Sequence, residues 1–213
     1  MSEHLVVFPS RDGFPLEGVL HVPAGAGPHP AVVVCHPHPL MGGTMHNRVI
    51  VAIVRALTAR GMAALRFNFR SRYGQGIAEQ GDVAGAFDFL TTQPSIAGDC
   101  LALAGYSFGA GVAARHAPDE ARALALVAPP SGDLSPDLLA GYERPVCIVV
   151  GDRDPVSPAA DVRAFVAGLV APTTLHVLPG VDHFFGPGLN RMASLVTDFL
   201  TSQVGGELSS DGF

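Results

Sequence analysis

The chain has 213 residues, of which 48% are hydrophobic and 15% are charged, and its formal net charge is −6. This length and composition suit one folded domain with a substantial core and exclude a largely disordered chain. The acidic balance argues against a nucleic-acid-binding surface and against a polybasic membrane surface.

The first residues carry none of the marks of a targeting segment. They lack a basic stretch followed by an apolar run, so we expect no signal peptide, and no apolar stretch approaches the length of a membrane span. The three cysteines, Cys35, Cys100 and Cys147, lie inside apolar runs, an odd count typical of buried thiols in a reducing compartment. We therefore expect a cytoplasmic protein that binds neither membranes nor nucleic acids.

Short apolar runs alternate with helical patterns along the whole chain. The first two runs flank Arg11-Asp12-Gly13, a turn signal that predicts an antiparallel hairpin. The later runs are nearly continuous in valine, leucine, isoleucine and alanine, as expected of parallel strands covered on both faces. In chain order, the expected strands span residues 4–9, 15–22, 31–35, 62–67, 100–106, 123–127, 146–150 and 173–177.

Apolar residues at helical spacing occupy the segments between these strands. Residues 49–57 form the first such helix. Asp82 is expected to cap the next helix, and Ser157 with Pro158 is expected to begin a later one as its N-cap and first residue. The other expected helices follow Ser107 directly and span about residues 189–200.

Two antiparallel strands followed by repeated strand–helix units predict an α/β fold. We expect a mostly parallel central sheet of about eight strands with helices on both faces. One domain would cover residues 1–204, and the glycine-rich residues 205–213 would fray. The interval 129–143 is only a proline-containing loop, too short for a large lid domain, so a site at the strand ends would be open.

Residues 105–109 read Gly-Tyr-Ser-Phe-Gly, between an apolar strand and a run of small helical residues. In this context the G-x-S-x-G pattern predicts a sharp strand-to-helix turn that presents Ser107 as a nucleophile. Glycines flank such a turn because side chains there would collide with neighbouring backbone. A serine needs a histidine base and an acid, so both should follow along the chain. The alternative is a structural glycine–serine turn.

The later strands supply candidates for both partners. Asp154 and His183 each follow a strand, which places them at the edge of the sheet where Ser107 lies. Asp152 is a rival acid, but it can satisfy N–H groups of its own loop. Asp154 lies deeper in that loop and has room to turn towards His183, so we favour it over Asp152. Asp182 is disfavoured because adjacent side chains in a loop diverge. A helix-capping role is the alternative for His183.

Hydrolysis at a serine requires two N–H donors for the oxygen that becomes negatively charged. One is expected from the backbone of Phe108, the residue after the nucleophile. The other is expected from His38, because Pro37 and Pro39 on either side have no N–H to donate. These prolines should also stiffen the loop.

A zinc site is the competing interpretation of this loop. His36, His38 and His46 lie close together in the sequence. No carboxylate or thiolate stands at a suitable spacing, however, and Cys35 is expected to be buried in its strand. We therefore expect neither a metal ion nor a cofactor.

Several segments together resemble a known family. They are His36-Pro-His-Pro-Leu-Met-Gly-Gly-Thr-Met45, Leu65-Arg-Phe-Asn-Phe-Arg70, Gly105-Tyr-Ser-Phe-Gly-Ala110, Gly151-Asp-Arg-Asp154 and Asp182-His183. Through them nearly the whole chain resembles the α/β-hydrolase superfamily, and more narrowly the small bacterial serine hydrolases related to dienelactone hydrolase. The order serine, acid, histidine is also that of the superfamily. The resemblance implies that Ser107 is the nucleophile, Asp154 the acid and His183 the base. It also implies oxyanion donors at the amides of His38 and Phe108.

The chain departs from that family in two places. Dienelactone hydrolases proper carry cysteine at the nucleophile position, where this chain has Ser107, so their substrate is not implied. Relatives usually follow the fourth strand with Arg-Gly-x-Gly-x-Ser and a longer loop, whereas this chain has the short Arg70-Ser-Arg-Tyr-Gly-Gln-Gly76. Arg70 and Arg72 could meet an anionic substrate, although an ordinary solvated loop is the favoured interpretation.

An open, mostly apolar site suits short-acyl carboxylic esters. Its candidate walls are Leu40, Met41, Tyr73, Phe184 and Phe185. We therefore expect a carboxylesterase-like serine hydrolase that cleaves a small-molecule ester through an acyl-enzyme. A thioesterase or acyltransferase would use the same triad, and a non-catalytic ligand-binding protein of the same fold is a further alternative.

Overall fold

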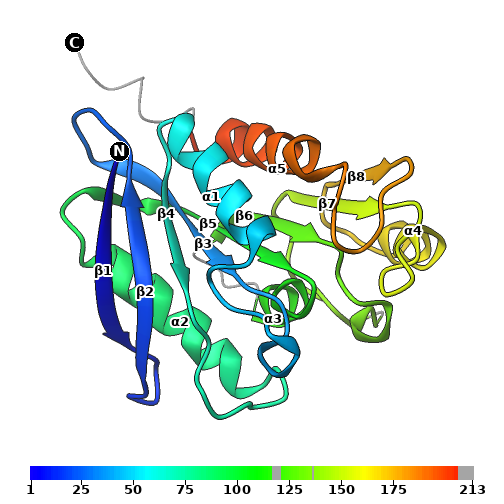
Figure 1. The fold of residues 1–213 in the computed structure, drawn as a ribbon, viewed down its shortest axis with the longest axis horizontal. Coiled ribbons are helices and arrows are strands. Elements are labelled where there is room, and N and C mark those ends of the chain that lie inside the picture. Colours follow the sequence, from blue (N-terminus) through cyan, green and yellow to red (C-terminus); the bar gives the residue numbers. More distant parts are fainter. Residues whose placement is uncertain (117–120, 136, 206–213) are drawn as a thin grey trace.

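A computed structural model describes residues 1–116, 121–135 and 137–205. Within these ranges eight strands form one sheet in the order β1-β2-β4-β3-β5-β6-β7-β8 (Figure 1). β2 runs antiparallel to both β1 and β4, and all other neighbouring strands are parallel. The expected mostly parallel sheet of about eight strands is therefore confirmed.

The elements have the following bounds. The strands are β1 (Ser2–Pro9), β2 (Pro15–Val22), β3 (His29–Cys35), β4 (Ala63–Phe67), β5 (Ile96–Tyr106), β6 (Ala121–Val127), β7 (Val146–Gly151) and β8 (Thr173–Leu178). The α-helices are α1 (Arg48–Ala59), α2 (Ala78–Thr91), α3 (Phe108–His116), α4 (Ala159–Ala167) and α5 (Leu189–Val204). Two short 3-10 turns are η1 (Pro39–Met41) and η2 (Ser131–Asp133).

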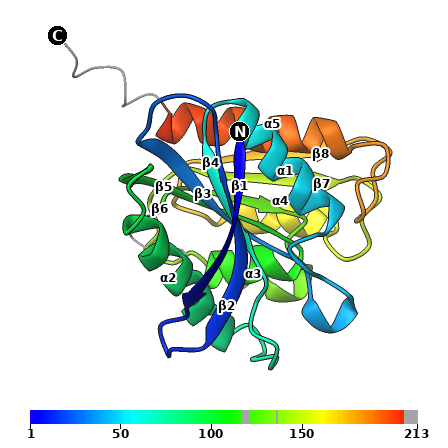
Figure 2. The same ribbon diagram turned by 60° about the vertical axis from the view of Figure 1, so that its left-hand side comes forward.

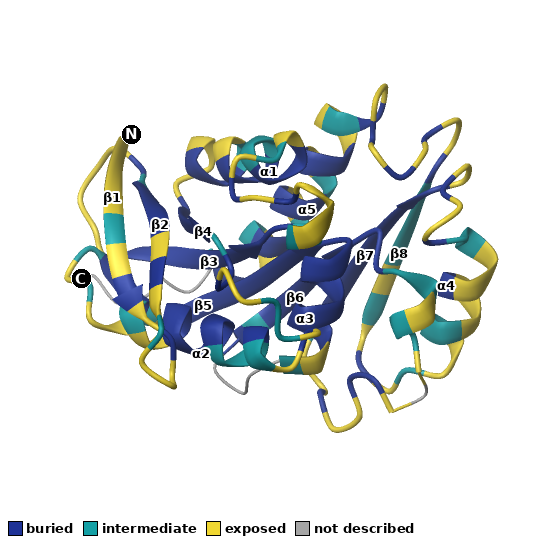
Figure 3. Cartoon of the chain, turned by 60° about the horizontal axis from the view of Figure 1, so that its bottom comes forward, coloured by how far each residue is buried: buried dark blue, intermediate teal, exposed yellow. Residues whose placement is uncertain are grey.

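The helices form one layer on each face of the sheet (Figures 1 and 2). α1 and α5 pack on one face, and α2, α3 and α4 pack on the other. Strands β3, β4 and β7 are buried along their whole length, whereas β1 at one edge is mostly exposed (Figure 3). Burial on both faces explains why the central strands are continuous apolar runs in the sequence.

Two helix starts differ from the sequence-based expectation. The sequence predicts Asp82 as a helix cap, but α2 begins at Ala78 and Asp82 lies inside it, fully buried. Its carboxylate accepts hydrogen bonds from Arg70 instead, so a tertiary ion pair has replaced the cap. α4 begins at Ala159, and the hydroxyl of Ser157 donates to the carbonyl of Pro129 rather than capping that helix.

Arg70 is a buried residue of the fold and neither a solvated nor a substrate-facing one. Its guanidinium donates to Asp12 at 2.8 and 2.9 Å, and to Asp82 on α2 at 3.0 and 2.6 Å. These hydrogen bonds, to Asp12 first and then to Asp82, raise the pKa of Arg70. Asp12 lies in the turn between β1 and β2, so the cluster ties the hairpin to α2 and to the segment after β4.

Removing the buried member of this cluster should destabilise the fold. We expect Asp82→Asn to lower the free energy of unfolding by about 3–5 kcal/mol, because a buried guanidinium loses its buried anion. Asp12→Asn is the matched control, since the side chain of Asp12 is largely exposed, and it should destabilise the fold far less than Asp82→Asn. Urea unfolding measures both changes. Equal losses in the two variants would contradict this role of Asp82.

The last helix runs beyond its expected end. α5 continues to Val204, which is buried against the same face of the sheet as α1. Residues 206–213, most of the segment expected to fray, lie outside the described residues. Among the described residues, no helix combines the length and the apolarity needed to cross a membrane.

Candidate active site

Four segments that follow parallel strands meet at one edge of the sheet. Ser107 follows β5, Asp154 follows β7, and His183 follows β8. The loop that carries His38 follows β3, the strand beside β5. Parallel strands all end at the same edge, which is why residues distant in sequence assemble there.

Ser107, His183 and Asp154 form a continuous hydrogen-bonded chain. Ser107 Oγ lies 3.0 Å from His183 Nε2, and His183 Nδ1 lies 2.8 Å from Asp154 Oδ2. The three residues are 9%, 7% and 4% exposed. The structure thus brings the three predicted side chains together, and Ser107 is the most exposed of the three.

Asp154 is held as an anion by its surroundings. Its Oδ1 accepts hydrogen bonds from the backbone N–H groups of Val156 at 2.8 Å and Ser157 at 2.9 Å. Burial by itself raises the pKa of Asp154, but the hydrogen bonds from His183 and the two amides outweigh it and lower the pKa overall. An ionised Asp154 keeps the proton on Nδ1 of His183 and leaves Nε2 free to accept the proton of Ser107.

The two rival carboxylates have other partners. Asp152 accepts a hydrogen bond from the backbone N–H of Gly180 at 2.7 Å. Asp182 accepts one from the backbone N–H of Phe184 at 3.0 Å. The carboxylate that contacts the imidazole of His183 is therefore that of Asp154.

The turn at Ser107 depends on both flanking glycines. Ser107 itself has a φ of 55°, a left-handed conformation that a non-glycine residue adopts only when its surroundings impose it. A Cβ added at Gly105 would lie 2.2 Å from the carbonyl oxygen of Gly109. A Cβ at Gly109 would lie 2.4 Å from the carbonyl oxygen of Cys35, the last residue of β3. Because Gly109 has no side chain, the start of α3 can pack directly against the backbone at the end of β3.

His38 and Phe108, the expected oxyanion donors, are neighbours in space. Phe108 is the first residue of α3, and the first N–H groups of a helix have no acceptor within it. The carbonyl of His38 accepts hydrogen bonds from the N–H groups of Met41 and Gly43, both at 3.0 Å, which fixes the loop. The His38 and Phe108 rings pack with their centroids 4.9 Å apart.

The end of β4 holds this loop in place, which the sequence did not reveal. Arg66 donates to the carbonyl of Met45 at 3.1 Å, and the side chain of Asn68 accepts from the N–H of Met45 at 2.9 Å. His36 accepts from the N–H of Phe69 at 3.0 Å. Burial lowers the pKa of His36 to about 4, so its ring is neutral.

The histidines of this loop have structural partners. Nδ1 of His36 lies 2.6 Å from the carbonyl oxygen of Pro37, so both its ring nitrogens are engaged with backbone. Nδ1 of His46 lies 3.1 Å from the guanidinium of Arg66. In the part of the chain that the structure describes, no three His, Cys, Asp or Glu side chains gather as a metal site would require.

A buried tyrosine, Tyr106, forms a hydrogen bond with the backbone of His183. The hydroxyl of Tyr106 donates to the backbone carbonyl of His183 at 3.0 Å, and the two rings lie 5.5 Å apart. Phe185 is fully buried and packs against Tyr106 with ring centroids 6.2 Å apart. The prediction that Phe185 lines an open pocket is therefore wrong, because its side chain belongs to the core beneath the site.

Three of the remaining predicted walls, Leu40, Met41 and Phe184, are largely exposed apolar side chains. Leu40 is 71% exposed, Met41 85% and Phe184 69%, and the ring of Phe184 lies 5.7 Å from that of His183. Tyr73 is half-buried against His38. We refer to Leu40, Met41 and Phe184 as the apolar rim. These side chains project from the loops that carry the site residues.

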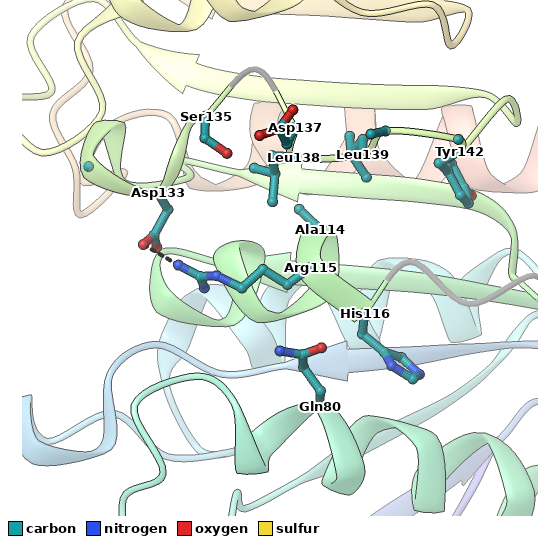
Figure 4. A pocket seen from close by; sticks show the side chains of 13 residues that line it. Gln80, Ala114, Arg115, His116, Asp133, Ser135, Asp137, Leu138, Leu139 and Tyr142 are labelled. Carbon is teal, nitrogen blue, oxygen red and sulfur yellow. Dashed lines mark hydrogen bonds and ion pairs between the residues drawn. The ribbon is translucent and has the colours of Figure 1, made fainter.

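A separate hollow of about 650 Å³ lies away from the triad (Figure 4). It is lined by Gln80 of α2, by the end of α3 and by the segment after β6, and the ion pair between Arg115 and Asp133 borders it. Ser107, Asp154 and His183 are not among its lining residues.

Comparisons with known proteins identify the family and the fold of the chain. A sequence model of the dienelactone hydrolase family matches residues 16–194. The chain is 30% identical over 188 residues to an uncharacterized protein of Rickettsia prowazekii, covering 80% of this chain and 78% of that one. It is similar in structure to an α/β serine hydrolase without a lid from Xanthomonas campestris, with a TM-score of 0.81, 28% identity and coverage of 100% and 98% of the two chains. It is also similar to an α/β serine hydrolase homologue from Coxiella burnetii, with a TM-score of 0.82, 32% identity and coverage of 94% and 98%.

Proposed function

We propose that this chain, which belongs to the dienelactone hydrolase family and has the α/β-hydrolase fold without a lid, cleaves small carboxylic esters through an acyl-enzyme on Ser107. The observation that carries the proposal is the hydrogen-bonded chain from Ser107 through His183 to Asp154. A hydroxyl, an imidazole and an ionised carboxylate in this order make up an activated nucleophile.

The proposed reaction has two halves. Ser107 Oγ attacks the ester carbonyl while its proton passes to Nε2 of His183, and Asp154 stabilises the imidazolium. The negative oxygen of the tetrahedral intermediate is bound by the amides of His38 and Phe108. His183 then protonates the leaving alcohol. In the second half His183 takes a proton from the water that attacks the acyl group. It then returns that proton to Ser107 Oγ as the acyl–oxygen bond breaks, which releases the acid and regenerates Ser107.

The surroundings of the triad favour a short or flat apolar substrate. Between β6 and β7 the described chain contains only the short turn η2, so nothing of lid size covers Ser107. The apolar rim is exposed and can cover an alkyl or aryl group at the mouth of the site. A long lipid chain would extend past this rim into water.

The pH dependence of activity tests the proposed base. We expect kcat/KM for an aryl acetate to rise with pH in a single step, because a protonated His183 cannot accept the proton of Ser107. Asp154, with its lowered pKa, is already ionised near neutral pH and should add no second step there. Initial rates of aryl-alcohol release measure the profile.

Two variants complete this test. His183→Ala should lose the step along with most of the activity. His176 lies on β8, the strand that precedes His183, and takes no part in the triad. His176→Gln should therefore keep the pH step. A flat profile in an active wild-type protein would contradict His183 as the base.

A further inference from the structure

The short loop after β4, residues 70–76, is rigidly built. Arg70 is fixed at one end by the buried Asp82. At the other end the buried carboxylate of Glu79 accepts hydrogen bonds from the N–H groups of Gly74 at 2.7 Å and Gly76 at 2.9 Å. Tyr73 directly precedes these anchored residues, so its position is defined by the loop and not by its own contacts alone.

This loop directs Tyr73 to the two expected oxyanion donors. The ring of Tyr73 lies 4.8 Å from that of His38 and 5.8 Å from that of Phe108, measured between centroids. Its hydroxyl lies 3.2 Å from Nε2 of His38. The three side chains therefore form one cluster beside the backbone amides that would bind the oxyanion.

The hydrogen bonds of His38 determine which proton the tyrosine can offer. Nδ1 of His38 accepts a hydrogen bond from the N–H of Leu40 at 3.2 Å, so this nitrogen carries no proton. A neutral imidazole then carries its proton on Nε2, and Nε2 donates it to the oxygen of Tyr73. The phenolic hydrogen of Tyr73 is consequently left for another acceptor. Among the described residues, the hydroxyl makes no second hydrogen bond.

We propose that Tyr73 donates this hydrogen to the substrate and selects esters that carry a second acceptor oxygen, an ether or carbonyl, close to the scissile carbonyl. The inference rests on the proposed function, and it identifies the class of ester. Tyr73 supplies one polar donor, whereas the side chains of the apolar rim offer none. A purely hydrocarbon group placed over it would remove water from the hydroxyl without replacing the hydrogen bond, which disfavours such esters.

Matched esters in which one methylene is replaced by oxygen test the proposal. In the acyl half, an aryl methoxyacetate is compared with the aryl butanoate. In the alcohol half, a 2-methoxyethyl ester is compared with the butyl ester. For each pair, the quantity compared is kcat/KM for the oxygenated ester divided by kcat/KM for the hydrocarbon ester. In at least one pair, Tyr73→Phe should lower this ratio by about threefold to tenfold relative to wild type. Taking this ratio removes the intrinsic difference in reactivity between the two esters, and the affected pair tells which half of the ester Tyr73 contacts.

Tyr142→Phe is the control. It removes a hydroxyl that donates to the carbonyl of Ala121, on a strand end away from the triad, and it should leave both ratios unchanged. Unchanged ratios in an active Tyr73→Phe protein, or an equal fall in Tyr142→Phe, would overturn the role of Tyr73 alone. Failure of wild type to hydrolyse any of the four esters or to react with a serine-directed probe would instead overturn the proposed function, and this inference with it.

Discussion

Replacing Ser107 with alanine is expected to lower kcat/KM for small esters by about 10⁴-fold or more. The reason is that Ser107 carries the atom that forms the acyl-enzyme, and no other hydroxyl is hydrogen-bonded to His183 among the described residues. The alanine variant should fold normally, because the substitution removes only one oxygen. Initial-rate kinetics on an aryl acetate, with thermal unfolding in parallel, measure both effects.

Ser131→Ala provides the control for this variant. Ser131 lies in η2, which follows β6, the strand next to β5 in the sheet. Its side chain takes no part in the triad. We expect this variant to stay within about twofold of wild type, as surface substitutions usually do. If Ser107→Ala kept an activity near that of the control, another nucleophile would have to perform the reaction.

Replacing Asp154 with asparagine should be nearly as damaging, with kcat lowered by about 10⁴-fold. An amide at this position can donate to Nδ1 of His183 and so favour the proton on Nε2, where it blocks acceptance of the Ser107 proton. The same change at Asp152 preserves an acceptor for Gly180 and leaves His183 untouched, so activity should change by less than about threefold. Comparable losses in the two variants would contradict the assignment of Asp154.

The fold could be predicted because its signals are local and repeated. Continuous apolar runs mark strands buried on both faces, and α1 buries the residues at helical spacing that the sequence shows. Ser107 was marked by the glycines that its turn requires, and the steric reason is visible in the 2.2 Å contact that a Cβ at Gly105 would make. His183 and Asp154 were found because strand ends converge on one edge of a parallel sheet.

The errors concern contacts between residues far apart in the sequence. Asp82 has the residue type of a helix cap, and only the position of Arg70 reveals that it is an ion-pair partner. Phe185 has an aromatic side chain of the kind that lines pockets. Its φ of 54° turns the chain after His183, however, and its side chain is buried against Tyr106. No local pattern distinguishes these outcomes.

The residues that support the loop after β3 were missed for the same reason. Arg66 lies in β4 and Asn68 directly after it, and both form hydrogen bonds with the backbone of Met45. Such hydrogen bonds require knowledge of which strands are neighbours. Tyr73 was expected as an apolar wall, and its role as a donor becomes apparent only from the two hydrogen bonds of His38.

Ser107, activated by His183, is the proposed nucleophile. A fluorophosphonate probe reacts covalently with such a serine, and intact-mass measurement followed by peptide mapping locates the adduct. We expect one adduct on wild type, located at Ser107, no adduct on Ser107→Ala, and much slower labelling of His183→Ala. Equal labelling of wild type and Ser107→Ala, or an adduct at another residue of an active protein, would contradict it.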